Sequence, residues 1–189
     1  MTQSRRYQLV HANSNPEVPH DTEDKRWWMR EGEVLEQQFV KLCQESLGIE
    51  AEINPDKRAD PTVADLIVQG RLADLKAQQT PFFTARRYGL DPQYCVTFNR
   101  KDYVRYLSLY PELDVFFWVN WRQTSWRDIE VQPMVGVYLV AFDSLCRRIS
   151  YGVPEHSYVR RTDDHKGNAR SSFLFDVRSF QCLHGGADI

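Results

Sequence analysis

The chain has 189 residues and a nearly balanced charge, with 24 Lys and Arg against 26 Asp and Glu. This length suits one well-buried core and is too short for two domains of ordinary size. With 42% hydrophobic and 26% charged residues, the composition excludes a disordered or fibrous protein. A net charge of −2 lacks the basic excess of a generic nucleic-acid binder, so any nucleic-acid surface must be local.

The cysteines, the apolar runs and the N-terminal residues indicate in which cellular compartment we expect the protein. The 4 cysteines are widely separated, which predicts reduced, mostly buried thiols and not a zinc knuckle or a redox motif. The longest apolar runs, residues 115–119 and 134–142, are far shorter than the roughly 20 residues that cross a bilayer. The first residues lack the apolar stretch of a secretory signal. We therefore expect a cytoplasmic protein with no membrane partner.

The polarity of the chain predicts an arm followed by a single domain. Residues 1–29 are polar and predict an N-terminal arm, with one short strand near 7–10. Residues 30–189 predict one domain. Its core covers 30–121, and a C-terminal extension of strands and helix covers 122–189.

The first predicted element of the domain is a helix that starts at residue 27 or 30 and ends near residue 47. Leu35, Phe39 and Leu42 recur at intervals of three and four residues, and Gly48 supplies a stop. Further helical patterns follow in two places, at 100–109 and 142–148. Runs of β-branched and aromatic residues between turn signals predict strands at 49–53, 63–68, 72–78, 94–98, 115–121, 134–140 and 172–177. This order of helix and strand implies an α/β or α+β sandwich.

One acid-X-lysine triplet has a better scaffold than the others in this chain. Such triplets occur at residues 23–25, 74–76 and 164–166, and only the middle one lies inside a predicted strand. Because side chains alternate along a strand, Asp74 and Lys76 share one face with Gln78. The opposite, apolar face is free to pack.

Asp65 interrupts an otherwise apolar stretch, residues 63–68, whose pattern predicts burial. An ionised carboxylate in such a place needs a cation or several hydrogen bonds. A hairpin turning at residues 69–71 would bring Asp65 near Asp74. Two close carboxylates repel each other, and a bound divalent cation is the usual remedy.

Glu36 projects from the apolar side of the first predicted helix. At about 100° per residue, Phe39, Val40 and Cys43 lie within roughly 60° of Glu36, near the edge of the core-facing stripe. Glu33 lies toward the polar side and is the weaker candidate. Glu36 is therefore the helical acid that we expect at the same site as Asp65 and Asp74.

These residues resemble the core of the PD-(D/E)XK nuclease superfamily, which includes restriction endonucleases and Holliday-junction resolvases. The core order of that family is a helix with Glu, a strand, a strand with the metal-binding Asp, a strand with acid-X-Lys, then helix and strand. The resemblance covers roughly residues 30–121. It implies a restriction endonuclease-like three-layer sandwich, with a central mixed β-sheet flanked by helices.

The resemblance also implies roles for individual residues. Asp65 and Asp74 would bind Mg²⁺ or Mn²⁺, with the backbone carbonyl of Leu75 as a further ligand and Glu36 completing the shell directly or through water. Lys76 would orient or deprotonate the attacking water. Gln78 is similar to an auxiliary active-site position in several branches of the family, which makes it a fifth catalytic candidate.

One position departs from the family pattern. Ala64 stands before Asp65 where proline is common, and Asp60, followed by Pro61, is an alternative ligand.

The loop after the predicted site combines aromatic and basic residues. Phe82 and Phe83 are candidates for stacking on bases, and Arg86 and Arg87 are candidates for binding phosphate. Aromatic residues are more often part of a core, and paired arginines are often only solvated surface charges. These four residues are the predicted nucleic-acid contacts.

The leading interpretation is an Mg²⁺-dependent nuclease that acts on nucleic acid, with DNA expected. Taken alone, Asp74 and Lys76 are better explained as a surface ion pair, and the addition of Asp65 and Glu36 favours the nuclease. The alternative is a nucleic-acid or protein-binding module that retains the fold without catalysis. A homodimer or a partner subunit is compatible with the nuclease, since cutting two strands needs two sites.

Overall fold

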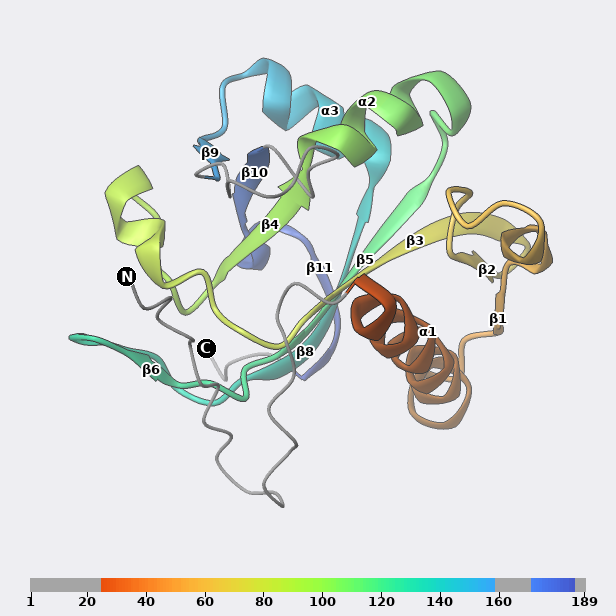
Figure 1. Ribbon diagram of the computed structural model, residues 1–189, viewed down its shortest axis with the longest axis horizontal. Coiled ribbons are helices and arrows are strands. Elements are labelled where there is room, and N and C mark those ends of the chain that lie inside the picture. Colours follow the sequence, from red (N-terminus) through yellow and green to blue (C-terminus); the bar gives the residue numbers. More distant parts are fainter. Residues whose placement is uncertain (1–24, 159–170, 186–189) are drawn as a thin grey trace, which may run out of the picture.

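A six-stranded mixed sheet lies at the centre of the molecule, whose computed structural model describes residues 25–158 and 171–185, with side chains from Gly32 onward (Figure 1). Among its strands only β3 and β5 run parallel, and every other neighbouring pair is antiparallel. This confirms a mixed α/β architecture around a central mixed sheet. From one edge to the other the strands are β1 (Ala51–Ile53), β2 (Leu66–Val68), β3 (Arg71–Gln78), β5 (Asp114–Asn120), β8 (Val135–Ala141) and β11 (Gln181–Gly185).

Helix α1 (Lys25–Leu42) covers one face of this sheet (Figure 1). Phe39 is fully buried, with its ring centroid 5.4 Å from that of Phe116 and 5.8 Å from that of Trp118. A π-helical turn, η1 (Cys43–Leu47), continues the helix to Gly48, whose φ of 63° ends it in the left-handed region. The predicted stop at Gly48 is therefore confirmed.

The opposite face of the sheet is covered by two helices and a second, three-stranded sheet. The helices are α2 (Arg100–Leu109) and α3 (Phe142–Ser150). The second sheet has the order β4 (Cys95–Asn99), β10 (Ser171–Asp176) and β9 (Glu155–Ser157). Phe98, Phe117 and Phe142 belong to the core between these layers and the central sheet. Because both faces of the central sheet are covered, the middle strand β5 is apolar on both sides.

Every helix and strand predicted within the described ranges is present. The strand ends shift by up to three residues, and the first helix starts at Lys25, before both of the predicted starts at 27 and 30. The strand expected near residues 7–10 lies outside the described residues. The structure also contains short elements that the sequence did not predict, because their residues show no strong pattern. They are the hairpin β6 (Ser125–Trp126) and β7 (Ile129–Glu130), the 3₁₀ turns η2 (Pro55–Arg58), η3 (Phe83–Tyr88) and η4 (Val177–Ser179), and the strands β9 and β11.

The β2–β3 hairpin sets the geometry that matters for function. Gln69 and Gly70 both have positive φ, 50° and 74°, as a tight two-residue hairpin turn requires. The pairing of Leu66 with Ala73 fixes the register. Continued by one residue, this register sets Asp65 opposite Asp74.

Of the helices in residues 25–158 and 171–185, none is both long enough and apolar enough to cross a bilayer.

Candidate functional site

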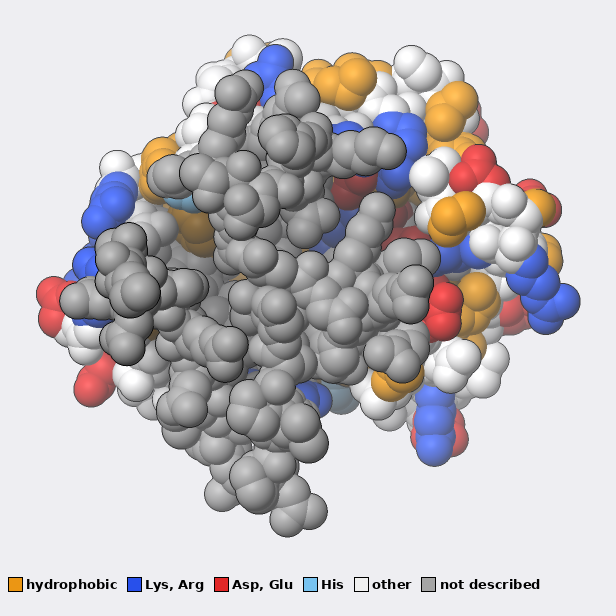
Figure 2. Space-filling model, viewed as in Figure 1, with side chains coloured by type: hydrophobic (Ala, Val, Ile, Leu, Met, Phe, Trp, Pro, Cys, Tyr) orange, Lys and Arg blue, Asp and Glu red, His pale blue; other side chains and the backbone are white. Residues whose placement is uncertain are grey.

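Charged side chains from five segments meet over β3, at the end of the sheet that carries β1 and β2. Acidic and basic side chains reach the surface there, between α2 and the β1–β2 end of the molecule (Figure 2). We call this group the charged cluster. Its members are Glu36, Lys57, Asp65, Asp74, Lys76, Asp102 and Arg105. With all groups ionised, four carboxylates face three cations, and one negative charge remains uncompensated.

Asp65 and Asp74 come together at the open end of the β2–β3 hairpin. Asp65 accepts a hydrogen bond through Oδ2 from the backbone N–H of Leu75, at 3.1 Å, so its carboxylate is held against β3. Burial raises the pKa of Asp74, and the nearby charge of Asp65 raises it further. The arrangement expected from the sequence, two acids drawn together by one tight turn, is present.

Asp74 is the most buried acid of the cluster, with 1% of its surface exposed. Its Oδ1 accepts a hydrogen bond from the Tyr106 hydroxyl. Its Oδ2 forms an ion pair with Lys76 Nζ at 2.7 Å and has no further partner within the described part of the chain. Burial raises the pKa of Asp74 to about 6, against the lowering effect of Lys76. Asp74 is therefore a buried carboxylate whose two oxygen atoms contact the Tyr106 hydroxyl and the Lys76 ammonium.

Asp65 differs from Asp74 in its ionisation, although it is also largely enclosed. Burial acts to raise the pKa of Asp65, but the positive charges of Lys76 and Lys57 hold that pKa below its ordinary value. The pKa of Asp65 is thus lowered, whereas that of its neighbour Asp74 is raised to about 6. Such a pair has hard oxygen donors for a divalent cation.

Lys76 is held from two sides by carboxylates. Its Nζ lies 2.7 Å from Asp74 Oδ2 and 2.7 Å from Asp102 Oδ2, and the rings of Phe98 and Tyr106 lie within 6 Å of it. Burial opposes its charge, but Asp74 and its other anionic neighbours raise the pKa of Lys76 well above its ordinary value. Lys76 therefore carries a fixed ammonium over β3.

Helix α2 supplies three side chains to the site that sequence reasoning missed. Arg105 donates hydrogen bonds to Asp102, at 3.0 Å, and to the Tyr106 hydroxyl, at 2.8 Å. Tyr106 in turn donates to Asp74. Asp102 and Tyr106 are one helical turn apart, four residues, which is the only sequence signal that sets them on a common face. This spacing does not say what the face packs against, and the contacts of Asp102 with Lys76 and of Tyr106 with Asp74 place it on β3.

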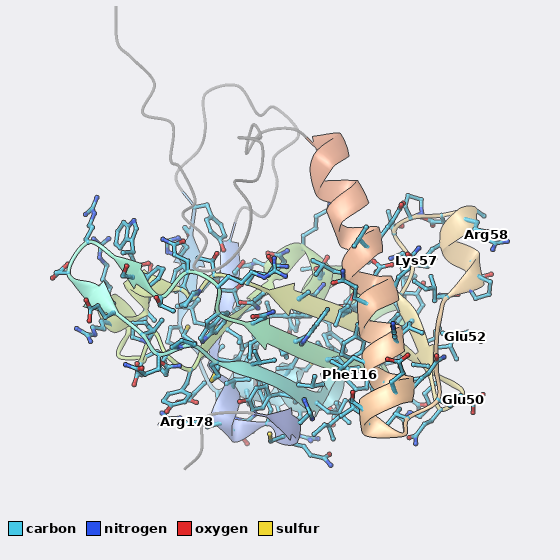
Figure 3. All side chains as sticks on the ribbon, turned by 90° about the horizontal axis from the view of Figure 1, so that it is seen from below. Glu50, Glu52, Lys57, Arg58, Phe116 and Arg178 are labelled. Carbon is cyan, nitrogen blue, oxygen red and sulfur yellow. The ribbon has the colours of Figure 1, made fainter. Side chains whose placement is uncertain are left out.

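Glu36 meets the cluster through Lys57, which was also missed. The ammonium of Lys57 lies 2.5 Å from Glu36 Oε1 and 2.6 Å from Asp65 Oδ1. Figure 3 labels Lys57 on the η2 turn beside α1. Glu36 thus reaches the site from the helix face that the spacing predicted, and its nearest charged partner is a lysine.

Two other predicted residues have protein partners. Gln78 pairs with the backbone of Thr97 in both directions, with Nε2 donating to the carbonyl oxygen at 3.0 Å and Oε1 accepting from the N–H at 3.3 Å. This amide joins β3 to β4. Asp60, the alternative metal ligand, is exposed and accepts hydrogen bonds from the backbone N–H and hydroxyl of Thr62.

The predicted nucleic-acid loop lies in η3, at the far side of the molecule from β1 and β2 (Figure 1). Phe83 is buried and stacks on Trp126 at 6.2 Å, and Phe82 packs on His156 at 4.9 Å. Base stacking by Phe83 would require the ring to leave this contact. Arg86 and Arg87 are exposed and stay candidates for binding phosphate.

Comparison with known proteins adds no relative. No family model, curated protein or solved structure matches the chain. The chemistry of the site therefore rests on its own residues.

The donor set fits a metal ion held by two carboxylates. Among the residues that the structure describes, no three His, Cys, Asp or Glu side chains are grouped as ligands of one ion. Mg²⁺ is commonly bound by only one or two carboxylates, with water and substrate phosphate completing its shell. Asp65 and Asp74 offer two carboxylates for this purpose, and Oδ2 of Asp74, whose one partner among the described residues is the Lys76 ammonium, would be the donor atom on Asp74.

The raised pKa of Asp74 predicts a pH dependence of stability. Its ordinary pKa is 3.8 and burial raises it to about 6, so between these values the folded protein holds a proton that the unfolded chain has lost. Without divalent metal, the stability of the wild type relative to Asp74→Asn should fall as the pH rises from about 4 through about 6. Urea denaturation of both proteins in EDTA, across this range, measures the difference. A difference that stays constant or grows with pH would contradict the assignment.

Proposed function

We propose that this chain is a metal-dependent nuclease that hydrolyses phosphodiester bonds, with DNA as the substrate class. The observation that carries the proposal is the meeting of Asp65 and Asp74 at the end of one hairpin, with Lys76 beside Asp74. Two carboxylates and an ammonium on adjacent strands suit a phosphodiester, because the substrate is an anion that a divalent cation can bridge to the carboxylates.

The order and pairing of the elements support a restriction endonuclease-like core. Helix α1 with Glu36 precedes the antiparallel strands β1, β2 and β3, and α2 leads into β5, parallel to β3. This agrees with the family order of helix, three strands, helix and strand. Strand β4 is an addition between β3 and α2, and it pairs in the second sheet.

In the proposed reaction, Asp65 and Asp74 would hold Mg²⁺, which would also bind the substrate phosphate. When bound, Mg²⁺ lowers the pKa of water and stabilises the charge that develops on the phosphate oxygens. Tyr106 fixes the carboxylate of Asp74 through its hydroxyl, and Leu75 fixes that of Asp65 through its N–H. Both carboxylates are thereby oriented before the substrate arrives.

Lys76 orients the attacking water in this mechanism. Its pKa lies well above the ordinary value, because the charges of Asp74 and its other anionic neighbours outweigh burial, so the amine stays protonated. A protonated lysine donates hydrogen bonds and offsets negative charge on the phosphate. Of the two roles that the family resemblance implies, this favours orientation over removal of a proton.

Cleavage and metal uptake test the proposal. The purified chain should cut supercoiled plasmid or oligonucleotide DNA with Mg²⁺ or Mn²⁺ and not with EDTA. Calorimetry should record Mn²⁺ uptake by the wild type that Asp74→Asn removes. Asp143→Asn, which changes an exposed aspartate paired with Arg147 on α3, is the matched control and should bind as the wild type does.

The ion pairs of the cluster favour a second candidate, a non-catalytic nucleic-acid or protein-binding module with the same fold. Lys76 has two carboxylate partners already, and Lys57 has two others, so most of the charge is balanced within the protein. Such a module would show neither DNA cleavage nor Mn²⁺ uptake that depends on Asp74. Uptake lost in Asp74→Asn would count against it.

A further inference from the structure

Lys57 is held in place by the backbone around it. The buried Asn54 side chain accepts a hydrogen bond from the Asp56 N–H at the start of η2 and donates to the carbonyl oxygen of Ala64 at 2.8 Å. The Asn54 N–H also donates to the carbonyl oxygen of Asp65 at 3.0 Å. These bonds tie the turn that carries Lys57 to the segment that carries Asp65. Lys57 is therefore part of a fixed arrangement, unlike a lysine on a solvated loop.

The ammonium of Lys57 bridges two carboxylates from different elements. Its distances of 2.5 Å to Glu36 Oε1 and 2.6 Å to Asp65 Oδ1 join α1 to the start of β2. Its side chain is only 17% exposed, so water screens this contact less than it screens a surface pair.

The carboxylate of Asp65 has two distinct sides. Oδ1 contacts Lys57, whereas Oδ2 is directed to Leu75 on β3, the strand of Asp74. Enzymes with two metal ions hold them about 3.5–4 Å apart, with a carboxylate bridging both. At Asp65 the position of one bridged cation is occupied by the ammonium of Lys57. A second divalent ion on this side would have to displace a protonated amine that is fixed by its own turn.

We propose that Lys57 takes the place of a second divalent cation, so that the site binds a single metal ion on the Asp65–Asp74 side. The inference rests on the proposed function, which supplies that metal ion. Glu36 then acts as a positioning residue, since it holds Lys57 and does not contact the metal. This assigns Glu36 a role other than the ligand role that the family resemblance implies.

Counting bound Mn²⁺ tests the inference. Equilibrium dialysis of the full chain should give one equivalent for the wild type and two for Lys57→Ala, because loss of the ammonium leaves Glu36 and Asp65 as an open carboxylate pair. Glu36→Gln combined with Lys57→Ala should return the count to one. Lys57→Gln, which removes the charge but keeps a hydrogen-bond donor, provides a second neutral variant should the alanine variant fold poorly. Thermal melting in EDTA and in Mn²⁺ reports folding of each protein.

Lys41→Ala is the matched control, because Lys41 is an exposed lysine of α1 that pairs with Glu45. It should bind one equivalent. Two equivalents in the wild type, or one in both Lys57 variants, would overturn the inference and leave the nuclease proposal standing. Two equivalents in the Glu36→Gln and Lys57→Ala double variant would also overturn it. No uptake by the wild type would overturn the nuclease proposal together with the inference.

Discussion

Replacing Lys76 with alanine is expected to slow metal-dependent DNA cleavage by at least about a hundredfold, the usual scale for losing a group that positions or transfers a proton in the transition state. The Lys76 ammonium lies 2.7 Å from Asp74 Oδ2 and 2.7 Å from Asp102 Oδ2. These two ion pairs hold its positive charge in a fixed position over β3. Alanine removes both the charge and the hydrogen-bond donor. Initial rates on a labelled duplex, at saturating Mg²⁺, measure the effect.

The loss must come from chemistry and not from unfolding. Removing the ammonium leaves the buried Asp74 without its cationic partner, which destabilises the protein. Bound Mg²⁺ should offset part of this, and Lys76→Met keeps the aliphatic stem as a second variant. Lys101→Ala, at an exposed lysine of α2, is the matched control and should cut at the wild-type rate. If a folded Lys76 variant cuts as fast as the wild type, the assignment of the active site fails.

Replacing Phe39 with alanine is expected to cost about 3–5 kcal/mol of the free energy of unfolding, the range for truncating a buried aromatic side chain. Phe39 has no exposed surface, and its ring packs against Phe116 and Trp118 of β5. Because neither strand residue can move far within the sheet, the site cannot collapse onto the cavity. Urea denaturation followed by tryptophan fluorescence measures the loss.

The same helix offers the control for this substitution. Val34→Ala removes an apolar side chain that is 45% exposed, so its effect should stay within about 0.5 kcal/mol. Glu36 lies three residues before Phe39, so any loosening of α1 should also weaken the contact between Glu36 and Lys57. A loss at Phe39 as small as that at Val34 would show that α1 is not docked through this ring.

Local patterns in the sequence predicted the elements and half of the site. Gln69 and Gly70 specify a tight turn, and alternation along β2 and β3 specifies which side chains face each other. The sequence predicted a turn over residues 69–71 that brings Asp65 near Asp74; the structure makes it a two-residue turn at Gln69 and Gly70, and that register sets Asp65 opposite Asp74. The first helix and its end at Gly48 also follow from local sequence, namely apolar residues at intervals of three and four and a glycine after them.

Only the tertiary structure decided which cations and which helix complete the cluster. Lys57 follows Glu36 by 21 residues, and Asp102 follows Lys76 by 26, and no periodicity connects positions so far apart. The contact between Lys76 and Asp102 depends on how α2 packs on the sheet through Phe98 and Tyr106 of the core, whereas the contact between Lys57 and Glu36 depends on how α1 and the η2 turn come together. Turn chemistry and side-chain alternation act over a few residues, so they can be predicted from the sequence. Charged side chains on separate elements come into contact only when the core packs, so their contacts cannot.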